Sequence, residues 1–107
     1  MPKYLFEGDY TAEGTRGLLK DGGSKRKAVV EKAVKKAGGK LEAMYFTFGV
    51  RDVVCIVDLP DNATAAAVSL AVSASGSIAF KTTVLLTPQE VDEAAKHPST
   101  GYTPPGA

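Results

Sequence analysis

Two neighbouring segments of the chain, residues 41–48 and 53–59, carry apolar side chains at odd and even positions alike. Both are short and rich in β-branched and aromatic residues, which predicts two strands, and the tight turn at 49–52 predicts that they form a hairpin. A strand with water on one face alternates apolar and polar residues. Because this pair does not alternate, both of its faces must be covered, which limits the folds open to the chain.

Parity assigns the side chains to faces, since successive residues of a strand point to opposite sides. In the first segment the two sets would be Leu41, Ala43 and Tyr45 against Met44, Phe46 and Phe48. In the second segment they would be Val53, Cys55 and Val57 against Val54 and Ile56. One set of each strand is expected to meet helices, and the other needs a different cover.

The remaining segments supply helices and two more strands. Strands are expected at 3–10 and 78–86, with Gly8 as a bulge or a point of close approach. Helices are expected after the caps Thr11, Ser24, Asp61 or Asn62, and Thr87, the last with a proline and a capping-box glutamate. The predicted ranges are 12–20, 25–37, 63–75 and 88–96, followed by an irregular tail at 97–107.

This order of elements predicts an α+β domain over residues 1–96. Strand, helix, two strands, helix and strand is the ferredoxin-like βαββαβ arrangement, a four-stranded antiparallel sheet with its helices on one face. The other face then needs a cover. We expect a second copy of the chain, packed face to face; the alternative is that the short helix from Pro88 folds back over the open face.

Length, charge and cysteine content exclude several classes of protein. The chain has 107 residues, enough for one domain, and a formal net charge of +1. One cysteine and one histidine exclude an internal disulfide and a zinc site made by one chain. No targeting or membrane segment is recognised, so we expect a cytoplasmic protein that uses no metal or cofactor.

Several stretches resemble a known family. They are Gly49–Asp61 followed by an alanine-rich helix and Ser75-Gly76, the opening Tyr4–Gly14, and Lys81–Val91. Together they resemble the GYD domain family of small bacterial proteins over roughly residues 3–93, with Arg51 where the family usually has a tyrosine. The resemblance implies a dimeric α+β barrel and leaves the chemistry open.

Two ionisable residues stand at the centre of otherwise apolar strands. Parity and the ferredoxin-like strand order place Glu7 and Lys81 on neighbouring strands and on one face, where they could pair inside a dimer cavity. Tyr45 could line the same cavity. We take these three as the candidate ligand-binding residues; the alternatives are a self-satisfied ion pair and a core aromatic.

The most uneven charge lies at residues 16–40, with nine basic side chains against two acidic ones. Lys25, Arg26 and Lys32 are the candidate anion-binding residues there. A solvated helix face explains the same charges, and no nucleic-acid-binding fingerprint supports the first interpretation. Cys55 is interpreted as a small buried apolar residue and not as a nucleophile.

These observations predict an oligomeric, non-enzymatic protein that binds a small molecule or has a structural role. The alternative is a cofactor-independent monooxygenase or isomerase that acts on a small organic molecule in the barrel cavity. That alternative comes only from relatives of the fold.

Overall fold

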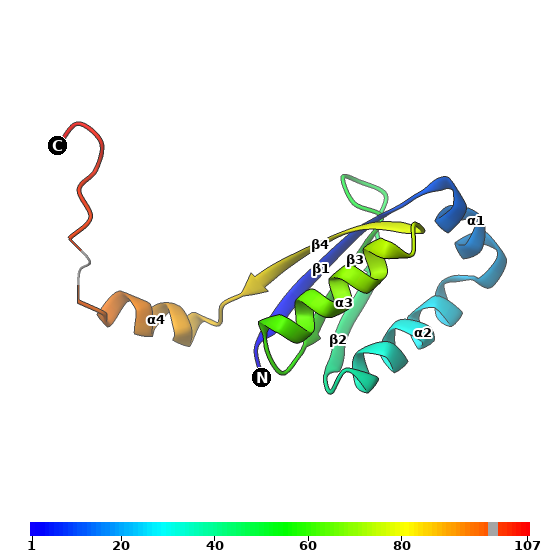
Figure 1. The fold of residues 1–107 in the computed structure, drawn as a ribbon, viewed down its shortest axis with the longest axis horizontal. Coiled ribbons are helices and arrows are strands. Elements are labelled where there is room, and N and C mark those ends of the chain that lie inside the picture. The colour runs from blue at the N-terminus through cyan, green and yellow to red at the C-terminus, as the bar shows by residue number, and fades with distance from the viewer. Residues whose placement is uncertain (99–100) are drawn as a thin grey trace.

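The order of strands and helices agrees with the one expected from the sequence. A computed structural model of the chain describes residues 1–98 and 101–107. The strands are β1 (Lys3–Tyr10), β2 (Lys40–Phe46), β3 (Val53–Asp58) and β4 (Ile78–Leu85). The helices are α1 (Ala12–Asp21), α2 (Gly23–Lys36), α3 (Asn62–Ala74) and α4 (Pro88–Lys96) (Figure 1).

The four strands form one antiparallel sheet in the order β2-β3-β1-β4. The first strand therefore lies in the middle, between the third and the last, as the ferredoxin-like arrangement requires. Glu7 of β1 is opposite Val54 on one side and Lys81 on the other. The α+β, ferredoxin-like prediction is confirmed.

The core lies between the sheet and the helices α2 and α3. Tyr4 and Phe6 of β1 and Cys55 and Val57 of β3 are buried on this face of the sheet. Helix α2 packs against the edge strand β2, and α3 packs against β4 at the opposite edge. The sheet face that carries the odd-numbered residues of β1 has no helix over it in the part of the chain that the structure describes.

A β-bulge changes the faces expected for β2. The register runs from Leu41 opposite Val57 directly to Ala43 opposite Ile56, so one residue of β2 is unpaired between them. Leu41 consequently joins Met44 and Phe46 on the helix-covered face and is only 8% exposed. Its expected place beside Ala43 and Tyr45 was wrong, because parity assumes an unbroken pleat.

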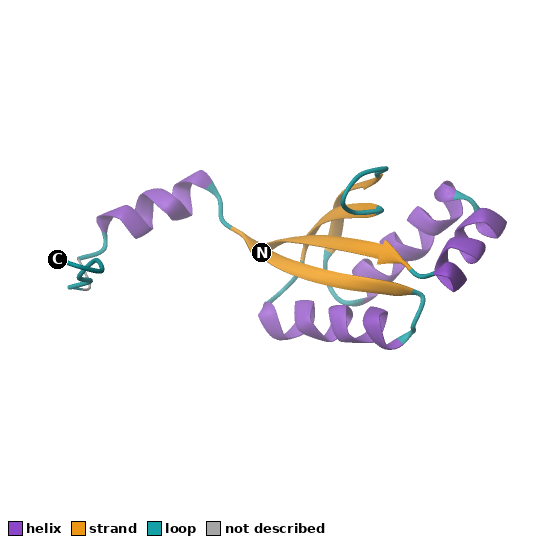
Figure 2. Ribbon diagram, turned by 90° about the horizontal axis from the view of Figure 1, so that it is seen from above, coloured by secondary structure: helices purple, strands orange, loops and turns teal. Residues whose placement is uncertain are grey.

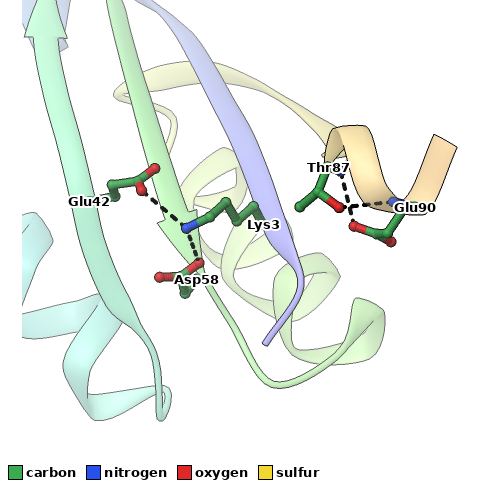
Figure 3. Close-up of polar contacts among 5 residues, drawn as sticks. All are labelled: Lys3, Glu42, Asp58, Thr87 and Glu90. Carbon is green, nitrogen blue, oxygen red and sulfur yellow. Dashed lines mark hydrogen bonds and ion pairs between the residues drawn. The ribbon is translucent and has the colours of Figure 1, made fainter. Parts of the chain in front are cut away.

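The predicted helix caps are confirmed at three of the four helices. Thr11 accepts a hydrogen bond from the Gly14 amide, and Asp61 accepts one from the Thr64 amide. Thr87 and Glu90 form the reciprocal capping box (Figure 3). The cap of α2 was predicted wrongly: the cap is Gly22, at φ 81°, and Ser24 already lies inside the helix.

Helix α4 extends away from the rest of the molecule (Figures 1 and 2). The alternative, in which this helix folds back over the open face of the sheet, is therefore wrong for the single chain. With this arm the radius of gyration is 17.0 Å, against about 13 Å for a compact chain of this size. The described part of the predicted irregular tail contains neither helix nor strand, and residues 99–100 lie outside the described residues. None of the described helices is long and apolar enough to span a membrane.

Candidate functional site

The open face of the sheet has an apolar centre between two charged clusters. Leu5 of β1 and Val54 and Ile56 of β3 are half-buried there, although no helix of residues 1–98 or 101–107 covers them. At one end of this face the Lys3 ammonium lies 2.8 Å from a carboxylate oxygen of Asp58 and 3.1 Å from one of Glu42 (Figure 3). These ion pairs raise the pKa of Lys3, first through Asp58 and then through Glu42.

The second cluster, at the other end, is organised by Arg51, which the sequence did not single out as a site residue. Its guanidinium lies 2.9 Å from a carboxylate oxygen of Asp9 and 3.8 Å from one of Glu7. Arg51 reaches β1 because the β2–β3 loop folds over the end of that strand. A basic residue in a hairpin loop opposite the acidic, open-face positions of β1 is the sequence signal that could have identified it.

The three predicted cavity residues share the open face but do not converge on one another. Glu7 and Lys81 are directly opposite in the register, as expected, yet the ion pair of Glu7 is with Arg51. Lys81 is exposed on the edge strand β4. Tyr45 lies on the opposite edge strand, β2, and is 68% exposed. Within one chain Tyr45 and Lys81 therefore lie on opposite edges of the same face of the sheet.

The helix-covered face of the sheet contains a partly enclosed apolar space, the inter-helix cleft. It lies between α2 and α3, which pack over opposite edges of the sheet. The cleft has a volume of about 100 Å³. Its floor includes Phe6, Met44 and Cys55, and its walls include Val30 of α2 and Val72 of α3.

Two polar side chains, Tyr10 and Arg26, lie at the cleft where it adjoins a wider hollow of about 580 Å³ beside α1. Both residues line both spaces. Arg26 points this way because it lies four residues before Val30, on the apolar stripe of α2 that continues to Val34. That spacing is visible in the sequence and could have separated Arg26 from its lysine neighbours.

The three predicted anion-binding residues do not form one site. Lys25 is exposed and pairs with Asp21 at 3.4 Å, one turn earlier along the chain. Lys32 is also exposed. Arg26 is half-buried at the cleft, and no carboxylate of residues 1–98 or 101–107 forms an ion pair with it. Most of the basic charge of α2 is thus a solvated helix face.

The Tyr10 hydroxyl and the Cys55 thiol of the cleft keep their protons at neutral pH. Burial raises the pKa of the Tyr10 hydroxyl, and the neighbouring Arg26 guanidinium opposes part of that rise. Burial raises the pKa of the Cys55 thiol to about 11. The interpretation of Cys55 as a small buried residue is confirmed, since a thiol that stays protonated is a poor nucleophile.

The comparisons with known proteins identify one family. The family model described as GYD domain matches the chain over residues 4–95. No curated protein and no solved structure matches it. The matched range includes the inter-helix cleft and the residues described on the open face, apart from Lys3.

Proposed function

The chain belongs to the GYD domain family, and we propose that it is a homo-oligomeric protein that binds a small molecule without catalysing its conversion. The observation that carries the proposal is the open face of the sheet. An apolar strip over the two central strands, flanked by charged clusters, is the pattern of an interface with an apolar core and a polar rim. The protein would act in the cytoplasm, where a single free thiol remains reduced.

A second copy is the cover that suits this face best. The described part of the chain offers no helix for it, since α4 extends away from the sheet. Two sheets packed face to face bury the same patch on both copies, so one self-complementary surface is sufficient. The half-buried residues Leu5, Val54 and Ile56 would form the centre of the contact.

The position of helix α4 also supports a second copy of the chain as the partner. The C-terminal end of β4 and the start of β2 lie at the same end of the sheet, because Leu85 and Asp58 are both opposite Lys3 and Asp58 is opposite Lys40. A two-fold axis along the strands would bring β4 of one copy beside β2 of the other. Helix α4 would then lie near the lysine-rich end of the second copy's α2, which is its last turn with Lys35 and Lys36.

The chemistry of the available groups favours binding over catalysis. Burial raises the pKa of the Tyr10 hydroxyl in the inter-helix cleft, which makes Tyr10 a poor general base near neutral pH. On the open face, Arg51 forms ion pairs with Glu7 and Asp9. Such groups can hold and orient a ligand.

Native mass spectrometry together with sedimentation velocity tests the proposal. We expect a dimer or a higher multiple for the wild type, carrying a discrete additional mass when a ligand survives purification. Ile56→Lys, which places a charge at the centre of the open face, should give a folded monomer. Leu70→Lys is the control, since Leu70 is an exposed apolar residue of α3, and it should leave the oligomer intact.

Two results would contradict the proposal. A wild type that is monomeric at every concentration would remove the second copy as the cover of the sheet. An oligomer that neither carries nor takes up any small molecule would leave only a structural role.

A further inference from the structure

The inter-helix cleft has a polarity that restricts what can occupy it. Of its lining residues, those from the sheet and from α3 are apolar apart from the Tyr10 hydroxyl and the Cys55 thiol. Arg26 is the charged lining residue, and it lies where the cleft adjoins the wider hollow beside α1. The space is therefore apolar inside and cationic at its mouth.

The charge at the mouth lacks an internal counter-ion in the described part of the chain. The hollow beside α1 is also lined by Glu13 and Asp21, but Asp21 forms its ion pair with Lys25, and neither carboxylate forms one with Arg26. A guanidinium is a planar donor that suits a carboxylate held by two parallel hydrogen bonds. The neighbouring Tyr10 hydroxyl can donate a further hydrogen bond.

The volume sets the size of the apolar part. An engineered apolar cavity of about 150 Å³ takes up benzene, and the cleft measures about 100 Å³. A straight or branched chain of about four to seven carbons, or one small ring, is of a comparable size. Larger groups would have to extend into the hollow beside α1.

We infer that the inter-helix cleft binds a small monocarboxylic acid, with its apolar body between α2 and α3 and its carboxylate on Arg26 and Tyr10. This inference rests on the proposed small-molecule-binding function and names the site and the ligand class. It moves the site from the open face, where Glu7, Lys81 and Tyr45 were expected to form it, to the opposite face of the sheet.

Isothermal titration with three six-carbon probes tests the ligand class. Hexanoate, hexanol and hexylamine share a chain and differ in the head group, so only the charge at the mouth of the cleft is varied. We expect saturable binding of hexanoate, with hexanol at least about tenfold weaker and hexylamine weaker still. Equal binding of hexanol or hexylamine, or no saturable binding of hexanoate, would overturn the inference.

Substitutions then locate the binding. Arg26→Met keeps much of the side-chain length and removes the charge, and it should weaken hexanoate binding by about 10- to 100-fold. Lys27→Met is the matched control, since Lys27 is the next residue of the same helix and is exposed. It should bind hexanoate as the wild type does. Wild-type affinity in Arg26→Met would place the bound probe elsewhere.

A second variant guards against a folding defect in the first. Ala33→Met narrows the cleft from the α2 side while leaving Arg26 in place, and it should also lose hexanoate binding while circular dichroism remains that of the wild type. Unchanged hexanoate binding in a folded Ala33→Met protein would contradict the location of the apolar chain.

The same samples separate this inference from the proposed function. Native mass spectra report the oligomeric state and any other bound mass independently of hexanoate. An intact oligomer that carries a different ligand and ignores hexanoate would overturn only the present inference. A monomer that binds hexanoate through Arg26 would overturn the proposed oligomer and support the cleft as the binding site.

Discussion

Gly14 and Gly17 of α1 are chemically identical, yet their surroundings differ. Gly14 is buried against the loop before β4, and a Cβ there would clash with the carbonyl oxygen of Ser77. A Cβ on Gly17 would have open space. The sequence treats both as residues that weaken a helix, because it does not show which glycine faces another backbone.

This difference predicts opposite effects of the same substitution. Gly14→Ala should lower the free energy of unfolding by about 1–3 kcal/mol, since the clash is with backbone that cannot move freely. Gly17→Ala should raise it by about 0.5–1 kcal/mol, because alanine restricts the unfolded chain and favours the helix. Urea denaturation of both variants measures the difference. Equal effects on the free energy of unfolding would contradict the close contact between Gly14 and the Ser77 carbonyl.

The buried thiol of Cys55 predicts a pH dependence of stability. Its pKa is raised from 9.0 to about 11 in the folded protein, so the folded state holds the proton more tightly than the unfolded state. The stabilisation is complete below pH 9 and is lost as the pH rises towards 11. The stability advantage of the wild type over Cys55→Ala should therefore shrink by roughly 2 kcal/mol across this range.

Denaturation of the two proteins at a series of pH values tests this prediction. Tyr10, whose pKa is raised mainly by its own burial, is present in both proteins, so most of its contribution cancels in the difference. A constant difference between pH 8 and pH 11 would show that Cys55 is not buried as the structure has it.

At the scale of elements, the β2–β3 loop is fastened to the end of β1. The Asp52 carboxylate accepts a hydrogen bond of 2.9 Å from the Tyr10 amide, and the Asp52 amide donates one of 3.0 Å to the Gly8 carbonyl. The Thr47 hydroxyl also donates to the Arg51 carbonyl. These contacts hold Arg51 where it meets the acidic residues of β1.

Removing the Asp52 carboxylate should therefore affect more than one hairpin turn. Asp52→Ala leaves the half-buried Tyr10 amide without its acceptor and should lower the free energy of unfolding by about 1–3 kcal/mol. Asp9→Ala, which removes a more exposed partner of Arg51, should cost less than about 1 kcal/mol. Thermal and urea denaturation of both variants measure the two losses. A larger loss for Asp9→Ala would show that the ion pair of Arg51, and not the hydrogen bond of Asp52, holds the loop on β1.

Element types were predictable because local patterns specify them. Thr11, Asp61 and Thr87 begin helices as their spacing indicated. Two details were not predictable: the cap at Gly22 and the bulge after Leu41. Both depend on how neighbouring elements meet, which the spacing of apolar residues does not record.

At the scale of the whole molecule, α4 projects away from the sheet and from the other helices. It has 9 residues, and a helix that short is marginal in water without packing. Val91 and Leu86 are exposed along it and just before it. Its acidic residues Glu90, Asp92 and Glu93 complement the lysine-rich end of α2, so we expect it to dock on a second copy.

A charge exchange tests this docking. Reversal of Asp92 and Glu93 to lysine should weaken the dimer and reduce the effect of salt on its dissociation constant, because both charges belong to the contact. Reversal of Lys35 and Lys36 to glutamate in the same chain should restore much of the lost affinity. Sedimentation equilibrium at low and high salt measures both effects. An unchanged dissociation constant would assign α4 to another partner and leave the sheet-to-sheet contact untouched.

The sequence by itself determined the α+β class and the strand order, because apolar periodicity, caps and turn residues are local and the ferredoxin-like connection follows from them. The family followed from a resemblance of whole stretches of residues, which the family model then matched. It also brought Glu7 opposite Lys81. Only the tertiary structure decided that Arg51 pairs with Glu7, that Arg26 leaves its lysine neighbours for an apolar cleft, and that α4 does not cover the sheet. Those outcomes depend on distances between elements far apart in the chain, and such distances are set by packing and not by spacing along the sequence.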